Sequence, residues 1–140
     1  MKNTEYSVTT DRERMDLRFV HDFLSTKSYW AQGRAREIVE RSMENSLCFG
    51  VFSPDGQQVG FARLVTDYAT FAWLCDVFID EAHRGKGLGK KLIQAVVSNP
   101  SVKGIKRIVL GTRDAHGLYR QYGGFQPIAN PERWMERPAT

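Results

Sequence analysis

Hydrophobic residues near the start of the chain recur at helical spacing. Leu17, Val20 and Leu24 lie three or four residues apart, so they share one face of a helix. Asp16 precedes them, and its carboxylate can accept hydrogen bonds from the free N–H groups of a first helical turn. The pattern therefore predicts a helix that begins after Asp16, and a second helix is expected from residue 34 to about residue 44.

Three runs of strand-forming residues follow the predicted helices. The runs 47–52 and 58–65 are separated by Ser53-Pro54-Asp55-Gly56, in which proline presets one turn angle and glycine permits a positive one. A third run, 71–79, is rich in aromatic and β-branched residues, which favour strands. Together the three runs predict an antiparallel meander that starts with a hairpin.

The pattern changes in the second half of the chain. Between residues 87 and 98 the apolar residues return to helical spacing, and Pro100 follows, so a helix is expected there. Residues 105–110 contain a continuous apolar core, as a strand covered on both faces would. Strand, helix and strand then predict a right-handed parallel crossover. A last helix from 115 to about 122 should end at Gly123-Gly124, before a final strand over 125–128.

Length and composition are typical of one folded domain. The 140 residues, 41% of them hydrophobic, can form one core, and at about 150 residues per domain we expect a single domain over residues 1–140. The longest apolar stretch, 71–75, is far shorter than the ~20 residues that span a bilayer. Residues 1–5 are polar and lead into no apolar stretch, so we expect no secretory signal, no membrane partner and a cytoplasmic location.

The two cysteines do not suggest a metal site. Cys48 and Cys75 stand alone in apolar runs, and the chain has neither Cys-x-x-Cys nor His-Glu-x-x-His. We therefore expect buried thiols in a reducing compartment and no bound metal.

Charge is distributed unevenly along the chain. Residues 1–83 carry 9 basic and 13 acidic side chains, whereas residues 84–140 carry 11 basic and 3 acidic ones. From Arg84 to Arg107 there are seven basic residues and no acidic one. This stretch could serve a phosphate-rich cofactor, a nucleic acid or solvation, and charge alone does not choose among them.

The segment with the clearest chemistry is Arg84-Gly85-Lys86-Gly87-Leu88-Gly89, between a predicted strand and a predicted helix. Glycines allow a ligand to approach the backbone, and the N–H groups at a helix start form an anion site suited to a pyrophosphate. The dinucleotide fingerprint would need glycine at position 90, which is Lys90, and the Walker pattern would need glycine at position 84. Both alternatives fail. A tight turn for close helix packing remains the purely structural interpretation.

The pattern Arg/Gln-x-x-Gly-x-Gly/Ala between a strand and a helix resembles the acetyl-CoA site of the GNAT N-acetyltransferase superfamily. Arg84, Gly87 and Gly89 match it. Upstream, residues 77–81 look like the end of the fourth strand of that family, although Glu81 stands where a proline is common.

Downstream, Ala115-His116-Gly117-Leu118-Tyr119 and then Gly123-Gly124-Phe125 resemble the Ala-x-x-Leu/Phe-Tyr … Gly-Phe segment of the family. There is one extra glycine, and Thr112 replaces an asparagine often found there. The resemblance covers the chain from about residue 7 to its C-terminus.

The resemblance implies an α/β (mixed α+β) fold. Its central mixed sheet would have about six or seven strands and about four helices, and it would splay between the fourth and fifth strands. In such a splay, the pantetheine arm of acetyl-CoA inserts like a partial extra strand and satisfies open backbone groups.

The same resemblance implies which residues hold acetyl-CoA. Backbone amides would bind the pyrophosphate along residues 85–89, that is Gly85, Lys86, Gly87, Leu88 and Gly89. Arg84 would support this loop, and Val77 and Ile79 would offer backbone groups to the pantetheine arm. Ala115, His116 and Tyr119 would lie near the cofactor on the other side.

Amide formation by direct attack needs a base for the amine and benefits from a donor for the leaving thiolate. Tyr119 matches the family tyrosine that can protonate the sulfur; it could instead be a core aromatic, and Tyr122 replaces it if the extra glycine shifts the register. Asp76 is the best-placed carboxylate for the base, but pairing with Arg63 on the neighbouring strand explains it equally well. Cys75 as an acylated nucleophile is disfavoured, because buried thiols are usually inert.

The acceptor is the least readable part of the site. Tyr29 and Trp30 lie between the first two predicted helices, where the family often builds its acceptor wall, although both could be core aromatics. The acidic half fits a cationic amine, and it could equally be a solvated face. Small-molecule and peptide amines, and a homodimer, all stay open.

Two other functions compete with acetyl transfer. A nucleic-acid-binding or anion-binding module would interleave aromatic with basic residues, but residues 84–110 contain no aromatic residue, so we expect no nucleic-acid partner. A protein of the same fold that binds acyl-CoA without catalysis, as a sensor, stays open.

Overall fold

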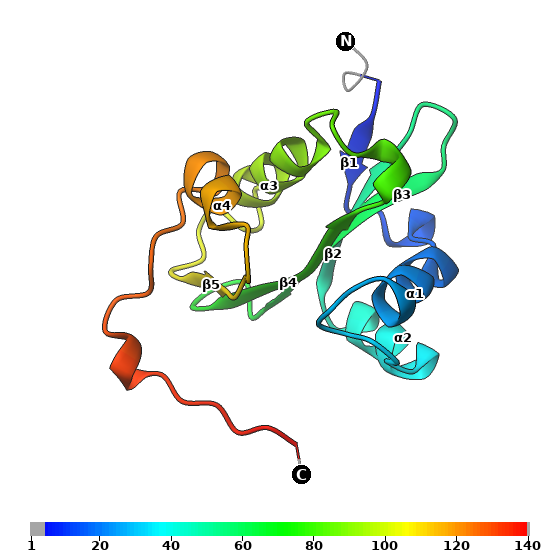
Figure 1. Ribbon diagram of the computed structural model, residues 1–140. Coiled ribbons are helices and arrows are strands. Elements are labelled where there is room, and N and C mark those ends of the chain that lie inside the picture. Colours follow the sequence, from blue (N-terminus) through cyan, green and yellow to red (C-terminus); the bar gives the residue numbers. More distant parts are fainter. Residues whose placement is uncertain (1–4, 140) are drawn as a thin grey trace.

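The computed structural model describes residues 5–139 (Figure 1). Its helices are α1 (Leu17–Thr26), α2 (Arg36–Glu44), α3 (Leu88–Ser98) and α4 (His116–Gly123). Its strands are β1 (Ser7–Thr9), β2 (Leu47–Phe52), β3 (Gln58–Thr66), β4 (Ala72–Ile79) and β5 (Ile108–Leu110). Short 3-10 turns cover η2 (Arg12–Arg14), η3 (Glu81–His83) and η4 (Pro131–Arg133).

The strands form one mixed sheet in the order β1-β2-β3-β4-β5. All neighbours are antiparallel except β4 and β5, which are parallel. Helices α1 and α2 cover one face of the sheet, and α3 and α4 cover the other (Figure 1). The predicted α/β class with a mixed sheet is therefore confirmed. Strand β1 was not predicted from the hydrophobic pattern.

Local signals in the sequence account for several element boundaries. Oδ1 of Asp16 accepts a 3.1 Å hydrogen bond from the backbone N–H of Phe19, so α1 begins at the predicted cap. Gly56 has φ +90° in the turn that joins β2 to β3, as the hairpin prediction requires. Gly124 has φ +72° and caps the end of α4.

Two hydrophobic cores lie on the two faces of the sheet. One joins α3 to the sheet through Leu88, Leu92, Ile93 and Val96. The other joins α1 and α2 to the sheet through Val20, Phe23, Leu24 and Val39, with Phe61 and Phe78 from the strands.

A bulge in β4 changes which face its residues meet. Two steps along β3, from Phe61 to Arg63, correspond to three along β4, from Phe78 to Cys75. The extra residue breaks the alternation, and Asp76 within it has φ +52°. As a result Asp76 points to the α1–α2 side, whereas Val77 packs against the α3 side.

The strand predicted over 125–128 is wrong, and the described sheet has five strands instead of six or seven. The N–H of Phe125 donates to the carbonyl of Tyr119 at the end of α4. Pro127 has no backbone N–H that could donate a hydrogen bond to a neighbouring strand. The strand predicted over 105–110 is shorter than expected. The N–H of Lys106 donates to Ala69, in the β3–β4 turn, before the ladder with β4 begins.

Strands β4 and β5 pair over three residues and then separate. The ladder joins Ala72, Trp73 and Leu74 to Ile108, Val109 and Leu110. Residues 75–79 of β4 have no strand partner on that side within the described chain. The expected splay between the fourth and fifth strands is thus present, narrow at Leu74 and open towards residues 84–89.

Candidate active site

The glycine-rich loop lies at the open end of the splay. Gly87 is the N-cap of α3 with φ +77°, and Gly85 has φ +79°. No side chain caps this helix, so the N–H groups of its first turn are left for a ligand or for solvent. Nε of Arg84 donates a 3.1 Å hydrogen bond to the carbonyl of Ile79, which ties the loop to the end of β4.

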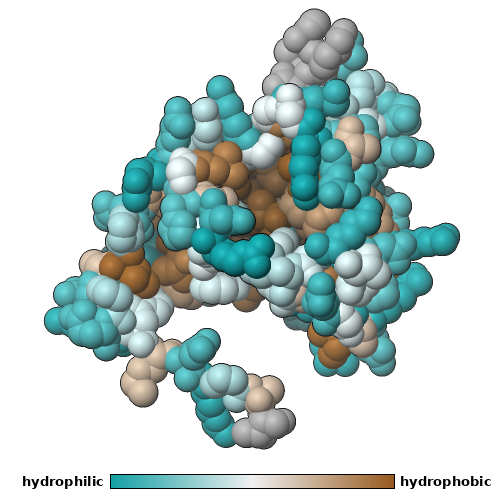
Figure 2. Space-filling view, in the orientation of Figure 1, coloured by the Kyte–Doolittle hydropathy of each residue, from teal (hydrophilic) through white to brown (hydrophobic). Residues whose placement is uncertain are grey.

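The two walls of the splay are hydrophobic. Val77 and Ile79 of β4, and Ala115 and Leu118 at α4, are partly buried and pack on the same core. Gly89 faces α4, since a Cβ at this position would lie 3.7 Å from Leu118. Figure 2 shows hydrophobic side chains exposed in a hollow near the centre of this face. The site predicted for a pantetheine arm is therefore an apolar surface with unpaired strand backbone.

Tyr119 lies beside this region on α4, with 9% of its surface exposed. Burial raises the pKa of Tyr119 to about 12, and the charge that an ionised Tyr29 would carry adds to the rise. The phenol therefore stays protonated at neutral pH. Its hydroxyl has no hydrogen-bond partner within residues 5–139. Every fully buried side-chain oxygen or nitrogen in these residues has a partner, so the Tyr119 hydroxyl is accessible to solvent.

Tyr122 has different surroundings. Nζ of Lys90, on α3, lies 5.0 Å from the centre of its ring. A Cβ at Gly123 would lie 2.8 Å from Phe125 and 3.0 Å from Ile93. A larger residue would therefore be crowded at this position, which explains the first glycine of the pair. The other, Gly124, adopts the left-handed cap. The extra glycine is therefore accommodated at the helix end, and the choice of Tyr119 over Tyr122 as the donor stays a prediction.

Asp76 is held by three donors. Its Oδ1 accepts from Nε1 of Trp30 at 2.8 Å, and its Oδ2 accepts from Arg34 at 3.0 Å and from Arg63 at 2.9 Å. Its side chain is 2% exposed. The pairing with Arg63 that the sequence allowed is present, and the role of Asp76 as a base stays a prediction.

The loop between α1 and α2 meets the loop between β5 and α4. The backbone N–H of Arg113 donates a 3.2 Å hydrogen bond to the Tyr29 hydroxyl, and its guanidinium lies 3.7 Å from the centre of the Tyr29 ring. Trp30 packs edge-on against Tyr29, with ring centres 5.0 Å apart. Both predicted acceptor residues are exposed, so they line a surface and are not core aromatics.

Sequence reasoning missed Arg34, Arg113 and the cap at Thr112. Oγ1 of Thr112 accepts from the N–H of Ala115 at 3.1 Å, so threonine caps the turn where the family often has asparagine. Arg113 is 84 residues from Tyr29, and no spacing rule connects them. The basic residue two positions before the Ala-x-x-Leu-Tyr segment was the one feature of the sequence that could have pointed to Arg113.

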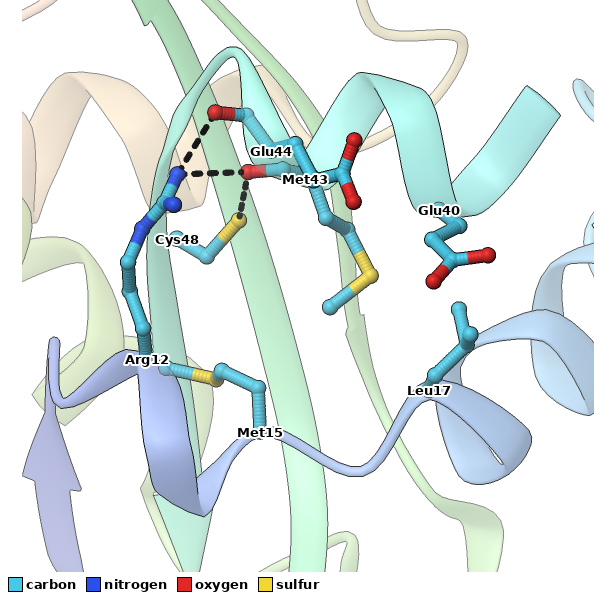
Figure 3. Close-up of a pocket in the computed structure, with 7 residues that line it drawn as sticks. All are labelled: Arg12, Met15, Leu17, Glu40, Met43, Glu44 and Cys48. Carbon is cyan, nitrogen blue, oxygen red and sulfur yellow. Dashed lines mark hydrogen bonds between the residues drawn. The ribbon is translucent and has the colours of Figure 1, made fainter. Parts of the chain in front are cut away.

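A cavity of about 900 Å³ borders β5 and Tyr119, with His116 also in its wall. A smaller cavity of about 170 Å³ lies on the other side, under α2 (Figure 3). There the guanidinium of Arg12 donates to the carbonyls of Met43 and Glu44, which caps α2. The polar contacts of this smaller cavity thus have a structural purpose.

Burial raises the pKa of both the Cys48 and the Cys75 thiols to about 11. Neither is therefore a thiolate at neutral pH, which disfavours Cys75 as a nucleophile. Within residues 5–139 no three His, Cys, Asp or Glu side chains cluster as metal ligands would. No helix there is long and apolar enough to cross a bilayer.

The fold and sequence are similar to those of acetyltransferases. The model of the acetyltransferase (GNAT) family matches residues 17–125. A candidate GNAT acetyltransferase from Xanthomonas campestris is 46% identical, and its structure gives a TM-score of 0.91 over 96% of this chain and 93% of that one.

Two curated proteins are also similar. A candidate acetyltransferase from Gibberella zeae is 25% identical over 155 residues, which cover 89% of this chain and 86% of that protein. An uncharacterised, ycf52-like N-acetyltransferase from Prochlorococcus marinus is 33% identical over 113 residues, which cover 77% of this chain and 62% of that protein.

Proposed function

The chain belongs to the acetyltransferase (GNAT) family, and from this premise we propose that it transfers an acetyl group from acetyl-CoA to an amine. One observation supports this above the others. An accessible, protonated hydroxyl, that of Tyr119, lies on α4 in the same core cluster as the strands that part, β4 and β5, and the glycine-rich loop lies at the far end of the same opening.

The residues along this opening fit acetyl-CoA. The N–H groups of residues 85–89 and the start of α3 would hold the diphosphate, with charge from Arg84 and Lys86. The unpaired backbone of Val77 and Ile79 would bind the amides of the pantetheine arm, and Ala115 and His116 would flank it. When bound, acetyl-CoA supplies an acetyl group activated as a thioester.

Tyr119 would act as a hydrogen-bond donor to the leaving sulfur. Burial raises its pKa to about 12, far above the ~8.5 of a thiol. Tyr119 therefore stays protonated and stabilises the thiolate by a hydrogen bond, without giving up its proton to a free thiolate. The proton that the thiol finally carries can come from the attacking amine.

Asp76 would position the acceptor loop. Three donors occupy its two oxygens, and its side chain is 2% exposed, so an amine cannot reach it without displacing an arginine or Trp30. The acceptor then has to lose its proton to water, and the rate should follow the fraction of free amine.

The test is a panel of amines incubated with the protein and acetyl-CoA. Thiol release is followed optically, and acetylated products are identified by mass spectrometry. We expect amine-dependent thiol release and one acetylated product class. If acetyl-CoA stabilises the protein thermally but no amine accelerates thiol release over hydrolysis, the protein binds acyl-CoA without transferring the acetyl group. If acetyl-CoA does not stabilise it either, both assignments are wrong.

A further inference from the structure

We propose that the acceptor is a small-molecule amine that also carries a carboxylate or a phosphate, and that Arg113 binds this anionic group. The inference rests on the acetyl transfer proposed above and adds the chemical class of its acceptor.

Arg113 is placed at the narrow end of the splay by two contacts with one residue. Its N–H donates to the Tyr29 hydroxyl at 3.2 Å, and its guanidinium stacks at 3.7 Å from the ring centre. Tyr119 lies in the first turn of α4, whose N-cap, Ala115, comes two residues after Arg113. Arg113 is thus close to the position proposed for the reacting sulfur.

Tyr29, on whose ring Arg113 stacks, is itself held in place. Tyr29 packs edge-on against Trp30, and Trp30 donates to buried Asp76. A guanidinium stacked on a fixed ring loses little further freedom when it binds an anion. The contacts that run from Asp76 through Trp30 and Tyr29 therefore fix the position of the Arg113 guanidinium before a ligand binds.

The guanidinium of Arg113 has no carboxylate partner within residues 5–139. Arg34 and Arg63, by contrast, are both paired with Asp76. Because the aromatic ring takes one face of the guanidinium, its N–H groups at the edge remain available, and that edge matches a carboxylate or a phosphate.

Two of the carboxylates near the acceptor loop are neutralised by neighbouring cations. Asp76 is neutralised by two arginines, and Asp80 lies 3.7 Å from Lys27. Asp114, next to Arg113, is exposed and has no ion-pair partner in the described chain. Glu40 and Glu44 of the acidic half line the small cavity under α2 (Figure 3). These two glutamates therefore lie at that cavity and not at Arg113, and the link between the acidic half and a cationic acceptor stays a prediction.

Aromatic rings provide a surface for the body of the acceptor. Trp73 on β4 is 42% exposed and Tyr29 is 48% exposed. The Trp73 ring reaches the β5–α4 loop, since a Cβ at Gly111 would lie 3.8 Å from its Cη2. An acceptor held between these rings would direct its anionic group to Arg113.

The test uses pairs of amines that differ in the anionic group: phenylalanine with phenylalaninamide for a carboxylate, and phosphoethanolamine with ethanolamine for a phosphate. Binding to the protein saturated with CoA is measured by calorimetry, and acetylation is measured separately. We expect at least one member that carries the anionic group to bind about 10- to 100-fold more tightly than its partner without that group, as for a charge-assisted bidentate pair. Which pair shows the difference identifies the group.

The variant Arg113→Ala should remove this preference, and Arg113→Lys should retain part of it. The matched control is Arg107→Ala, which removes a guanidinium stacked on Trp134, 4.5 Å from its ring centre, away from Tyr29. Arg107→Ala should keep the preference, and neither alanine variant should change acetyl-CoA binding.

The outcomes for the two proposals are separable. Equal binding of the members with and without the anionic group, or an unchanged preference in Arg113→Ala, overturns the inference even if amines are acetylated. Preferential binding of the anionic member without acetylation of any amine supports the role of Arg113 and overturns acetyl transfer.

Discussion

The indole Nε1 of Trp30 donates a 2.8 Å hydrogen bond to Oδ1 of Asp76 and so joins the α1–α2 loop to the bulge of β4. Asp76 has φ +52°, a conformation that costs a residue other than glycine about 1–3 kcal/mol. Its bonds to Arg34 and Arg63 help to maintain it. The acceptor loop and the strand that borders the splay are therefore mechanically coupled.

The variant Asp76→Asn tests this coupling. Asparagine tolerates the left-handed backbone, so the change removes mainly the charge that Arg34 and Arg63 face. We expect the free energy of unfolding to fall by about 3 kcal/mol, as when one partner of a buried ion pair is lost. Urea denaturation measures it.

Asp80→Asn is the control, because Asp80 forms a more exposed pair with Lys27 and should lose less than about 1 kcal/mol. A stable Asp76→Asn protein with a large loss of kcat and an altered pH–rate profile would instead make Asp76 the base.

Gly87→Asp should abolish binding of acetyl-CoA. The new carboxylate would stand at the start of α3, where the diphosphate is proposed to bind. Thermal shift should show that acetyl-CoA protects the wild type more than NAD or ATP does, and that it does not protect this variant. Gly87→Ala has the same strain at φ +77° without the charge, and it should keep part of the protection. Equal protection of the wild type by all three ligands would contradict the cofactor assignment.

Tyr119→Phe should lower kcat by roughly 100-fold with little effect on acetyl-CoA affinity, because the ring stays and the donor to the sulfur is lost. Steady-state kinetics and calorimetry separate the two effects. Tyr122→Phe is the matched control, since that ring packs under Lys90. If Tyr122→Phe alone slows turnover, the register of the closing helix is misassigned; if neither variant does, the thiolate leaves without a donor.

Stability should decrease at alkaline pH. Burial raises the pKa of Cys48 and Cys75 from 9.0 to about 11 and that of Tyr119 from 10.0 to about 12. The folded protein therefore keeps protons that the unfolded chain loses in these ranges. Their stabilising contribution is fully present below about pH 9 and is lost as the pH rises to about 12.

Urea midpoints at a series of pH values from 8 upward, at constant ionic strength, would measure this decrease. Cys75→Ala should make it shallower, because one of the three groups is gone. A midpoint that stays constant up to pH 11 would show that the thiols and Tyr119 are not shielded from water in the folded protein.

Residues close in sequence determined much of this fold. The carboxylate of Asp16 caps α1 three residues away, and Gly56 supplies the positive φ of the β2–β3 turn. The glycine loop opens α3 as its spacing predicts. These features depend on contacts within a few residues, so the pattern of residue types contains the information. The local pattern also predicts that Tyr119 lies on the closing helix, four residues after Ala115, as it does in α4.

Other features depend on residues that come together only when the chain folds. The bulge at Asp76 shifts the β3–β4 register by one residue, and a shift of one reverses the face of every following side chain. The segment 125–128 reads as a strand, but the cap of α4 takes the N–H of Phe125. Arg113 meets Tyr29 across 84 residues because β4 and β5 part beyond Leu74. That separation of the two strands, which follows from how far their ladder extends in the folded chain, decides which side chains surround the site.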